Sequence, residues 1–185
     1  RNPKARPTAS QICNHPFFWN ATKRSAFLCD FSDRLESDFE YGDFDRLLVE
    51  RKASDIVGLS WTSRIDASLL NNVQKFRSYD ASLVRDCLRL IRNKHHHFDE
   101  LPQEFKVIAP DQKSLLEYFE NRFPCLLFHC YSICRGNLKM GDQLAIKYDI
   151  VRVLRHLTVA RKPSSPSSIE KQSSDINEFT NMTSK

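Results

Sequence analysis

Scarcity of glycine is the feature of this sequence that most restricts its fold. The 185 residues contain 4 glycines against 13 phenylalanines. Glycine supplies the positive φ angles of tight turns and allows the close backbone approach of phosphate-binding loops. A glycine-rich phosphate loop, a collagen helix and most turn-rich all-β folds are therefore excluded. The apolar residues recur at helical spacing instead, without a convincing alternation of period two, so the sequence predicts an all-α fold.

Seven segments carry this helical pattern. Their approximate bounds are Lys23–Glu36, Phe44–Val49, Ala67–Phe76, Asp80–Phe98, Ser114–Phe123, Pro124–Cys134 and Asp142–Leu157. Residues Ile56–Trp61 are expected to form a loop that is broken at Gly58. In the fourth segment Asp80 or Ser82 is a suitable N-cap, and Pro102 prevents the helix from continuing.

Composition divides the chain into four parts. Residues 1–19 contain three prolines, and residues 20–135 contain six of the helical segments. Residues 136–162 are predicted to add one further helix, with Ile146 and Ile150 on the same side. Residues 163–185 are rich in serine and lack helical periodicity, so a disordered C-terminal tail is expected.

Charge and cysteine content restrict the setting in which the chain works. The net charge of +5 permits an anionic partner without requiring one. No segment approaches the roughly 18 apolar residues of a membrane span, and no signal peptide opens the chain, so this segment is not expected to contact a membrane. The cysteines form no Cys-x-x-Cys pair and mostly lie in apolar runs, which predicts free thiols in a reducing compartment. They are Cys13, Cys29, Cys87, Cys125, Cys130 and Cys134.

The segment Asp80–Phe98 is amphipathic and concentrates basic residues on one side. Projected at 100° per residue, five polar side chains fall within about 80° of Arg89, and the apolar side chains lie opposite. The five are Arg85, Arg92, Asn93, His96 and His97. Such a face is either an ordinary solvated surface or a surface that contacts phosphates.

The run His95-His96-His97 does not predict a metal site. Consecutive helical residues point about 100° apart, and a helical zinc pair needs spacing of four residues. His95 falls near the apolar side and is expected to be a packed histidine.

The arginine, asparagine and histidine side chains of this helix would serve RNA cleavage without metal. That reaction needs a base for the 2′-hydroxyl, an acid for the leaving 5′-oxygen and cationic donors for the phosphate. Histidine can serve as acid or base at neutral pH.

Several motifs occur together in this chain and are specific in combination. They read Lys75-Phe76-Arg77-Ser78-Tyr79, then Val84-Arg85-Asp86, then Arg92-Asn93-Lys94-His95-His96-His97-Phe98, then Glu100-Leu101-Pro102, with Ser32-Asp33-Arg34-Leu35-Glu36 before and Arg122-Phe123-Pro124 after them. This combination closely resembles the kinase-extension nuclease (KEN) domain of the inositol-requiring unfolded-protein-response sensor and, more distantly, of ribonuclease L. Residues 1–19 resemble the end of a protein-kinase C-lobe and its junction with the nuclease.

The resemblance implies a metal-independent endoribonuclease that leaves a 2′,3′-cyclic phosphate and a 5′-hydroxyl. By this resemblance Tyr79 is the general base, His97 the general acid, Arg92 the group that steadies the phosphate and Asn93 the amide that positions it. Lys94, Arg77, Arg89 and His96 are the expected substrate-binding residues. A normal tyrosine is only about 0.1% ionised at pH 7, so a tyrosine base needs a cationic neighbour, plausibly Arg77 or Arg92.

The resemblance also implies partners and a location. We expect RNA as substrate, a back-to-back homodimer, an upstream kinase domain in cis, and the cytosolic face of the endoplasmic reticulum if the chain is part of the full sensor. The nuclease step needs no cofactor, whereas ATP or ADP and Mg²⁺ belong to the kinase. The sequence departs from the family over Phe105–Lys113, and no family motif is evident in Arg135–Lys162. A catalytically silent dimerisation or RNA-binding module is the alternative, although such a module would be free to lose Tyr79 and His97.

Overall fold

The computed structural model describes residues 8–37, 42–74, 78–137 and 141–150 of the chain. All regular secondary structure in these ranges is helical, which confirms the all-α prediction. Arg77 and the predicted tail, 163–185, lie outside the described residues. Among the described residues no helix is both long enough and apolar enough to cross a bilayer.

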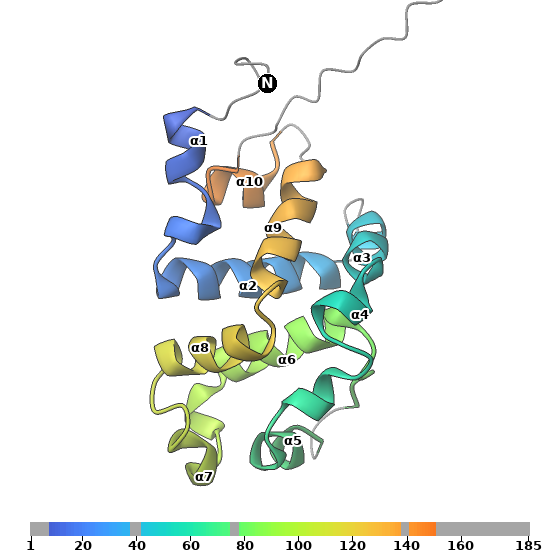
Figure 1. Ribbon diagram of the computed structural model, residues 1–185, viewed down its shortest axis with the longest axis vertical. Coiled ribbons are helices and arrows are strands. Elements are labelled where there is room, and N and C mark those ends of the chain that lie inside the picture. The colour runs from blue at the N-terminus through green and yellow to red at the C-terminus, as the bar shows by residue number, and fades with distance from the viewer. Residues whose placement is uncertain (1–7, 38–41, 75–77, 138–140, 151–185) are drawn as a thin grey trace, which may run out of the picture. The chain divides into compact units, whose positions relative to one another are not determined.

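Figure 1 shows the arrangement of the α-helices, and the described residues also form three short 3₁₀ helices between them. The first half contains α1 (Ala9–Cys13), η2 (Pro16–Phe18), α2 (Ala21–Glu36), α3 (Gly42–Glu50), α4 (Ala53–Ile56), η3 (Trp61–Arg64) and α5 (Ala67–Gln74). The second half contains α6 (Val84–His96), η4 (Phe98–Glu100), α7 (Gln103–Lys106), α8 (Gln112–Arg122), α9 (Leu126–Gly136) and α10 (Gln143–Lys147).

Two long helices, α2 and α6, form the centre of the helical structure. They pack along each other, α8 contacts both of them, and α3 and α9 pack against α2 (Figure 1). Apolar residues of α2 at helical spacing are fully buried, among them Phe27, Phe31 and Leu35. The apolar side of α6, including Val84, Cys87 and Ile91, is buried as its sequence pattern predicts. The core therefore fixes α6, which carries most of the predicted site residues, together with α2, which packs along it.

Helix α6 is shorter than the predicted segment Asp80–Phe98. It begins at Val84, and its N-cap residue, Leu83, contributes no side-chain hydrogen bond. The Glu50 carboxylate, at the end of α3, accepts hydrogen bonds from the backbone N–H groups of Val84 (2.8 Å) and Arg85 (2.9 Å). Asp80 and Ser82 were predicted as possible N-caps, but the Asp80 carboxylate accepts hydrogen bonds from the backbone N–H and the hydroxyl of Ser82 in a local turn. A residue distant in sequence therefore satisfies the donors that a local cap would have satisfied.

The helix predicted over Asp142–Leu157 ends earlier than expected, and residues 151–157 of that prediction lie outside the described residues. Helix α10 ends at Lys147, and Asp149 adopts a left-handed backbone with φ of 53°. Aspartate tolerates this conformation better than most residues. Ile146 is exposed whereas Ile150 is buried, so the two do not share a face as predicted. The Asp142 side chain caps α10 and also pairs with Arg34 of α2 at 2.8 Å, which joins the two helices.

The loop predicted over Ile56–Trp61 is confirmed only for residues 57–60, because Ile56 ends α4 and Trp61 begins η3. Gly58 has φ of +85°, a conformation that favours glycine. A Cβ at this position would approach the Arg64 guanidinium to 3.0 Å, so the lack of a side chain also gives that group room.

Candidate active site

One pocket gathers most of the residues that the sequence predicts as functional. It has a volume of about 440 Å³. Its lining residues are Val73, Tyr79, Arg92, Asn93, Lys94, His97 and Glu100. Helix α5 contributes the first of these, the segment before α6 contributes Tyr79, and α6 with its C-cap contributes four more. All four predicted catalytic residues, together with Lys94, therefore line the same pocket.

Tyr79 is held by contacts with its ring and its hydroxyl. Its ring packs edge-on against Trp61 with 6.0 Å between centroids. Its hydroxyl oxygen accepts a hydrogen bond of 3.0 Å from the Asn93 side-chain amide. Trp61 also donates from its indole nitrogen to the Asp80 carbonyl (3.0 Å) and from its backbone to the Ala81 carbonyl (2.9 Å). The tyrosine hydroxyl is thus fixed at the pocket with its own proton free to point elsewhere.

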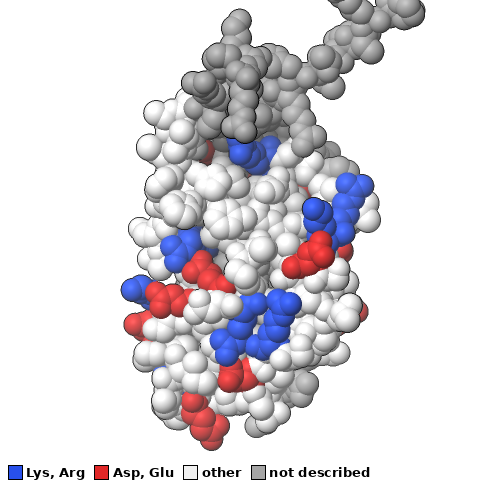
Figure 2. Space-filling model, viewed as in Figure 1, with Lys and Arg blue, Asp and Glu red and all other residues white. Residues whose placement is uncertain are grey.

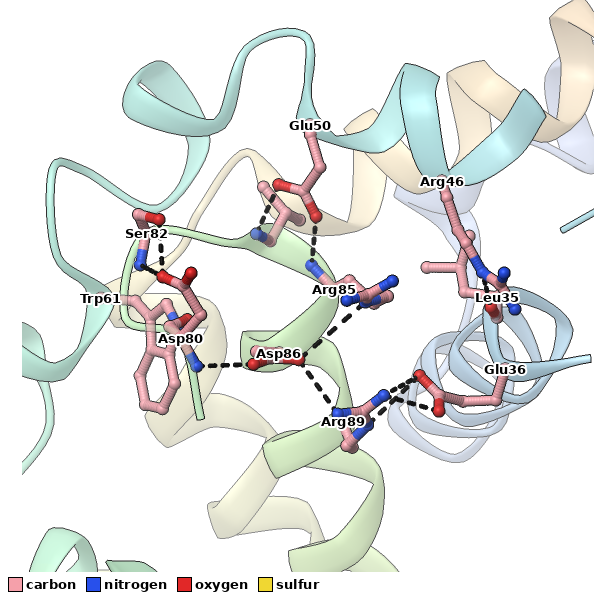
Figure 3. Close-up of polar contacts among 11 residues, drawn as sticks. Leu35, Glu36, Arg46, Glu50, Trp61, Asp80, Ser82, Arg85, Asp86 and Arg89 are labelled. Carbon is pink, nitrogen blue, oxygen red and sulfur yellow. Dashed lines mark hydrogen bonds and ion pairs between the residues drawn. The ribbon is translucent and has the colours of Figure 1, made fainter. Parts of the chain in front are cut away.

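A network of charged side chains also holds the segment that follows Tyr79. The nearly buried Asp86 carboxylate accepts a 2.6 Å hydrogen bond from the Asp80 backbone N–H. The second oxygen of Asp86 accepts from Arg89 at 3.1 Å, and the Arg89 guanidinium also binds both carboxylate oxygens of Glu36 on α2 (2.5 and 2.6 Å). Figure 3 shows Arg89 between these two carboxylates. Arg89, predicted to bind substrate, is therefore engaged by two carboxylates and does not line the pocket.

The predicted basic face of α6 is only partly displayed. The exposed fractions of the Arg85, Arg89 and Arg92 side chains are 33, 19 and 27%. Helix α2 packs over this side and supplies Asp33 and Glu36, which pair with Arg92 and Arg89. Figure 2 shows on one face of the molecule that basic groups mostly lie beside acidic ones. The expectation of a freely displayed arginine face is thus wrong, because a neighbouring helix covers and partly neutralises it.

Arg92 combines a fixed edge with access to the pocket. Its Nε lies 2.8 Å from the Asp33 carboxylate. This aspartate comes from α2, so the pair joins α6 to the neighbouring central helix. The Nε atom is buried and its N–H is not aligned for a hydrogen bond, so the contact is an ion pair. A guanidinium has five N–H donors, so the Nη groups can serve a phosphate.

His97 stands where α6 ends. Its backbone N–H closes the last turn by bonding to the Asn93 carbonyl at 2.9 Å, and its own φ and ψ, −108° and 42°, leave the helix. Its ring Nδ1 lies 3.0 Å from Glu100, and both side chains are exposed. This contact occupies Nδ1 and leaves Nε2 for a substrate. Glu100 was missed by the assignment of site residues, although its place in the Glu-Leu-Pro motif was a usable signal.

Lys94 lies at the buried side of the pocket. Its ammonium donates a 2.6 Å hydrogen bond to the Asn72 side-chain oxygen of α5. Burial lowers the pKa of Lys94, because removal from water disfavours the charged form. Sequence reasoning missed Asn72, which offers no local pattern.

The other two histidines differ from His97. His95 is partly buried and shares a 3.0 Å hydrogen bond with Ser25 of α2, which confirms the expectation of a packed histidine. Burial, and then the neighbouring His96, lower the pKa of His95. His96 is exposed and does not line the pocket. In the described part of the chain no three His, Cys, Asp or Glu side chains are grouped so that they could hold a metal ion.

Comparison with known proteins identifies the family. The model of the family described as Ribonuclease 2-5A matches residues 24–148. The chain belongs to this family. The match confirms the resemblance drawn from the sequence motifs. It also includes α10, so the conclusion that the segment after Arg135 lacks family character is wrong up to residue 148.

Curated members of this family are larger proteins. The chain is 37% identical over 143 residues to "Sensor for unfolded proteins in the ER ire1" of Schizosaccharomyces pombe, 40% over 135 residues to "Serine/threonine-protein kinase/endoribonuclease IRE2" of Homo sapiens, and 42% over 132 residues to "Serine/threonine-protein kinase/endoribonuclease ire-1" of Caenorhabditis elegans. These matches cover 76, 72 and 70% of this chain but only 13, 14 and 13% of the relatives. The chain thus corresponds to a small part of each relative.

Proposed function

We propose that this chain is a metal-independent endoribonuclease that cleaves RNA by general acid–base transesterification. The reaction would yield a 2′,3′-cyclic phosphate and a 5′-hydroxyl. The observation that carries the proposal is the single pocket lined by Tyr79, Arg92, Asn93, Lys94 and His97. Membership in the Ribonuclease 2-5A family, and the endoribonuclease names of two of the relatives, support the same reaction.

The chemistry assigns one task to each group. Tyr79, acting in its phenolate form, takes the proton of the ribose 2′-hydroxyl, and the 2′-oxygen forms a bond to phosphorus. The bond from phosphorus to the 5′-oxygen breaks, and His97 delivers a proton to that leaving oxygen. Each proton-transfer group contributes about 10²- to 10⁴-fold in rate. Arg92 binds the phosphate as its negative charge redistributes, and Asn93 keeps the Tyr79 oxygen in place through its 3.0 Å bond.

Two features of the pocket support this division of roles. Tyr79 reaches the pocket from the segment before α6 and His97 from the end of α6, so the two approach it from separate parts of the chain. Arg92 and Asn93 are adjacent residues of α6 that line the same pocket, and Asn93 is bonded to Tyr79. An in-line displacement requires a base and an acid on opposite sides of the phosphate, and the proposal assigns these two places to Tyr79 and His97.

The names of the relatives extend the proposal to the biological setting. We propose that the chain works beside a protein kinase domain in cis, at the cytosolic face of the endoplasmic reticulum, in messenger RNA splicing or decay during the unfolded protein response. Activation would occur by formation of a back-to-back homodimer. The nuclease step itself would need no cofactor, whereas ATP or ADP and Mg²⁺ would serve the kinase.

The decisive experiment is cleavage of a stem-loop RNA by the 185-residue chain in EDTA, with analysis of the product ends. We expect cyclic phosphate termini, a specific rate that rises with protein concentration, and loss of cleavage in His97→Ala. His15→Ala, which removes a partly buried histidine far from the pocket in sequence, should retain the rate. A need for added metal, or full activity of His97→Ala, would refute the mechanism. RNA binding without turnover, at concentrations where sedimentation shows a dimer, would favour the catalytically silent binding module.

A further inference from the structure

The Asp33–Arg92 ion pair has no role in the reaction outlined above. Arg92 is a long side chain with several rotatable bonds, and a useful phosphate contact requires one of its many rotamers. Its Nε lies 2.8 Å from the Asp33 carboxylate, which comes from α2. Among the described residues, Asp33 alone forms an ion pair or hydrogen bond with the Arg92 side chain. The orientation of this guanidinium therefore depends on Asp33.

The pair belongs to a regular contact between the two central helices. Asp33 and Glu36 are three residues apart on α2, and Arg89 and Arg92 are three residues apart on α6. Asp33 pairs with Arg92, and Glu36 pairs with Arg89. Residues three apart lie on the same face of a helix, so the two pairs form successive rungs between antiparallel helices. Because α2 is anchored in the core, its acids are fixed points for the arginine that faces the pocket.

Asp33 does not line the catalytic pocket. It binds the Nε edge of Arg92, whereas Arg92 itself reaches the lining. Because Asp33 contacts the Nε edge of the guanidinium, it restrains the group without occupying its Nη donors. The exposed fractions are 27% for Arg92 and 50% for Asp33, so the pair alone should stabilise the fold only weakly.

We propose that Asp33 is a positioning residue that holds the Arg92 guanidinium in the orientation that binds the scissile phosphate. This inference rests on the proposed endoribonuclease function and adds a residue to it. Asp33 acts through Arg92 and does not touch the RNA. Its removal should therefore lower the rate of the chemical step more than the affinity for RNA.

The test compares Asp33→Asn with a matched control in the full chain. Glu120→Gln breaks the Arg24–Glu120 pair, which also joins α2 to another helix, spans 2.7 Å and is less exposed (23 and 26%) than the Asp33–Arg92 pair. We expect Asp33→Asn to lower kcat on a stem-loop RNA about 10- to 100-fold with KM changed less than about threefold, as small misplacements of a catalytic group do. Glu120→Gln should leave kcat unchanged. Sedimentation and thermal unfolding should show the same oligomeric state and similar melting temperatures for both variants.

A double-mutant cycle separates positioning from a general structural effect. If Asp33 acts only through Arg92, then Asp33→Asn should cost nothing further in an Arg92→Ala background. An equal loss in both backgrounds, or a kcat of Asp33→Asn equal to that of Glu120→Gln, would overturn the inference. Failure of the proposed function looks different, because Arg92→Ala and His97→Ala would then retain full cleavage. If those two variants lose cleavage while Asp33→Asn stays fully active, the positioning role of Asp33 is wrong and the proposed endoribonuclease function still holds.

Discussion

The side-chain amide of Asn93 donates a 3.0 Å hydrogen bond to the hydroxyl oxygen of Tyr79. The two residues come from different segments, since Asn93 lies in the last turns of α6 and Tyr79 precedes the helix. The contact links the proposed base to the helix that carries the proposed phosphate-binding arginine. Substitutions of Asn93 and of Tyr79 should therefore affect the rate of cleavage through the same oxygen atom.

Loss of the Tyr79 hydroxyl should remove the base but keep the fold. We expect Tyr79→Phe to lower kcat about 10²- to 10⁴-fold, the usual contribution of a proton-transfer group. Asn93→Ala should lower kcat by a smaller factor and should have little further effect in the Tyr79→Phe background, because it acts on the tyrosine oxygen. Single-turnover cleavage of a stem-loop RNA measures both effects. Tyr131→Phe is the control, since Tyr131 lies in α9 and does not line the pocket. Additive losses in the double variant would contradict the proposed link.

The sequence predicted the existence of most helices because their apolar periodicity is local. The segment Lys23–Glu36 became α2 (Ala21–Glu36), and Ser114–Phe123 became α8 (Gln112–Arg122). The bounds of α6 were not predictable in the same way. The backbone groups of residues 80–81 are satisfied by Trp61 and Asp86, and the first turn is capped by Glu50. Trp61 and Glu50 lie far away in sequence, so no local pattern indicates them.

The site could be predicted in its residues but not in its electrostatics. The family motif indicated Tyr79, Arg92, Asn93 and His97, and these do line one pocket. A helical projection of α6 alone cannot show which neighbour covers each face, so the pairing of Arg89 with Glu36 was missed. The acids on α2 and the arginines on α6 have the same spacing of three residues, which indicates ion pairs between the helices. This indication can be used only once the two helices are known to pack together.

The engagement of Arg89 by two carboxylates predicts how RNA binding depends on salt. A phosphate contact releases counterions, so its loss should reduce the slope of log affinity against log salt concentration by about one. We expect Arg89→Gln to leave this slope unchanged and Arg92→Gln to reduce it. Arg89→Gln should still lower kcat, because it loosens Asp86 and with it the Tyr79 segment. Fluorescence anisotropy across a salt series would measure the slopes. A reduced slope for Arg89→Gln would mean that this arginine contacts the phosphate after all.

The capping of α6 by Glu50 predicts a loss of stability. Replacement of an N-cap group by alanine costs about 0.5–2 kcal/mol, and Glu50 serves two backbone donors. We therefore expect Glu50→Ala to lower the free energy of unfolding by about 1–2 kcal/mol. Urea denaturation followed by circular dichroism measures this change. Glu117→Ala is a suitable control, because Glu117 is exposed and pairs only loosely with Lys113 at 3.7 Å. A loss no greater than that of the control would show that water replaces the cap at no cost.

The packed histidine His95 predicts how stability depends on pH. Burial lowers the pKa of His95, so the folded chain binds a proton there less readily than the unfolded chain does. This contribution to stability is fully present above the unfolded value, near 6.5, and is lost as pH falls from there through the lower folded pKa. His95→Gln can keep a hydrogen bond to Ser25 but cannot titrate, so its stability should fall less between pH 7.5 and 5.5 than that of the unaltered chain. Urea denaturation at a series of pH values tests this difference. Parallel pH profiles for the two proteins would show that the Ser25–His95 contact tolerates a charged imidazole.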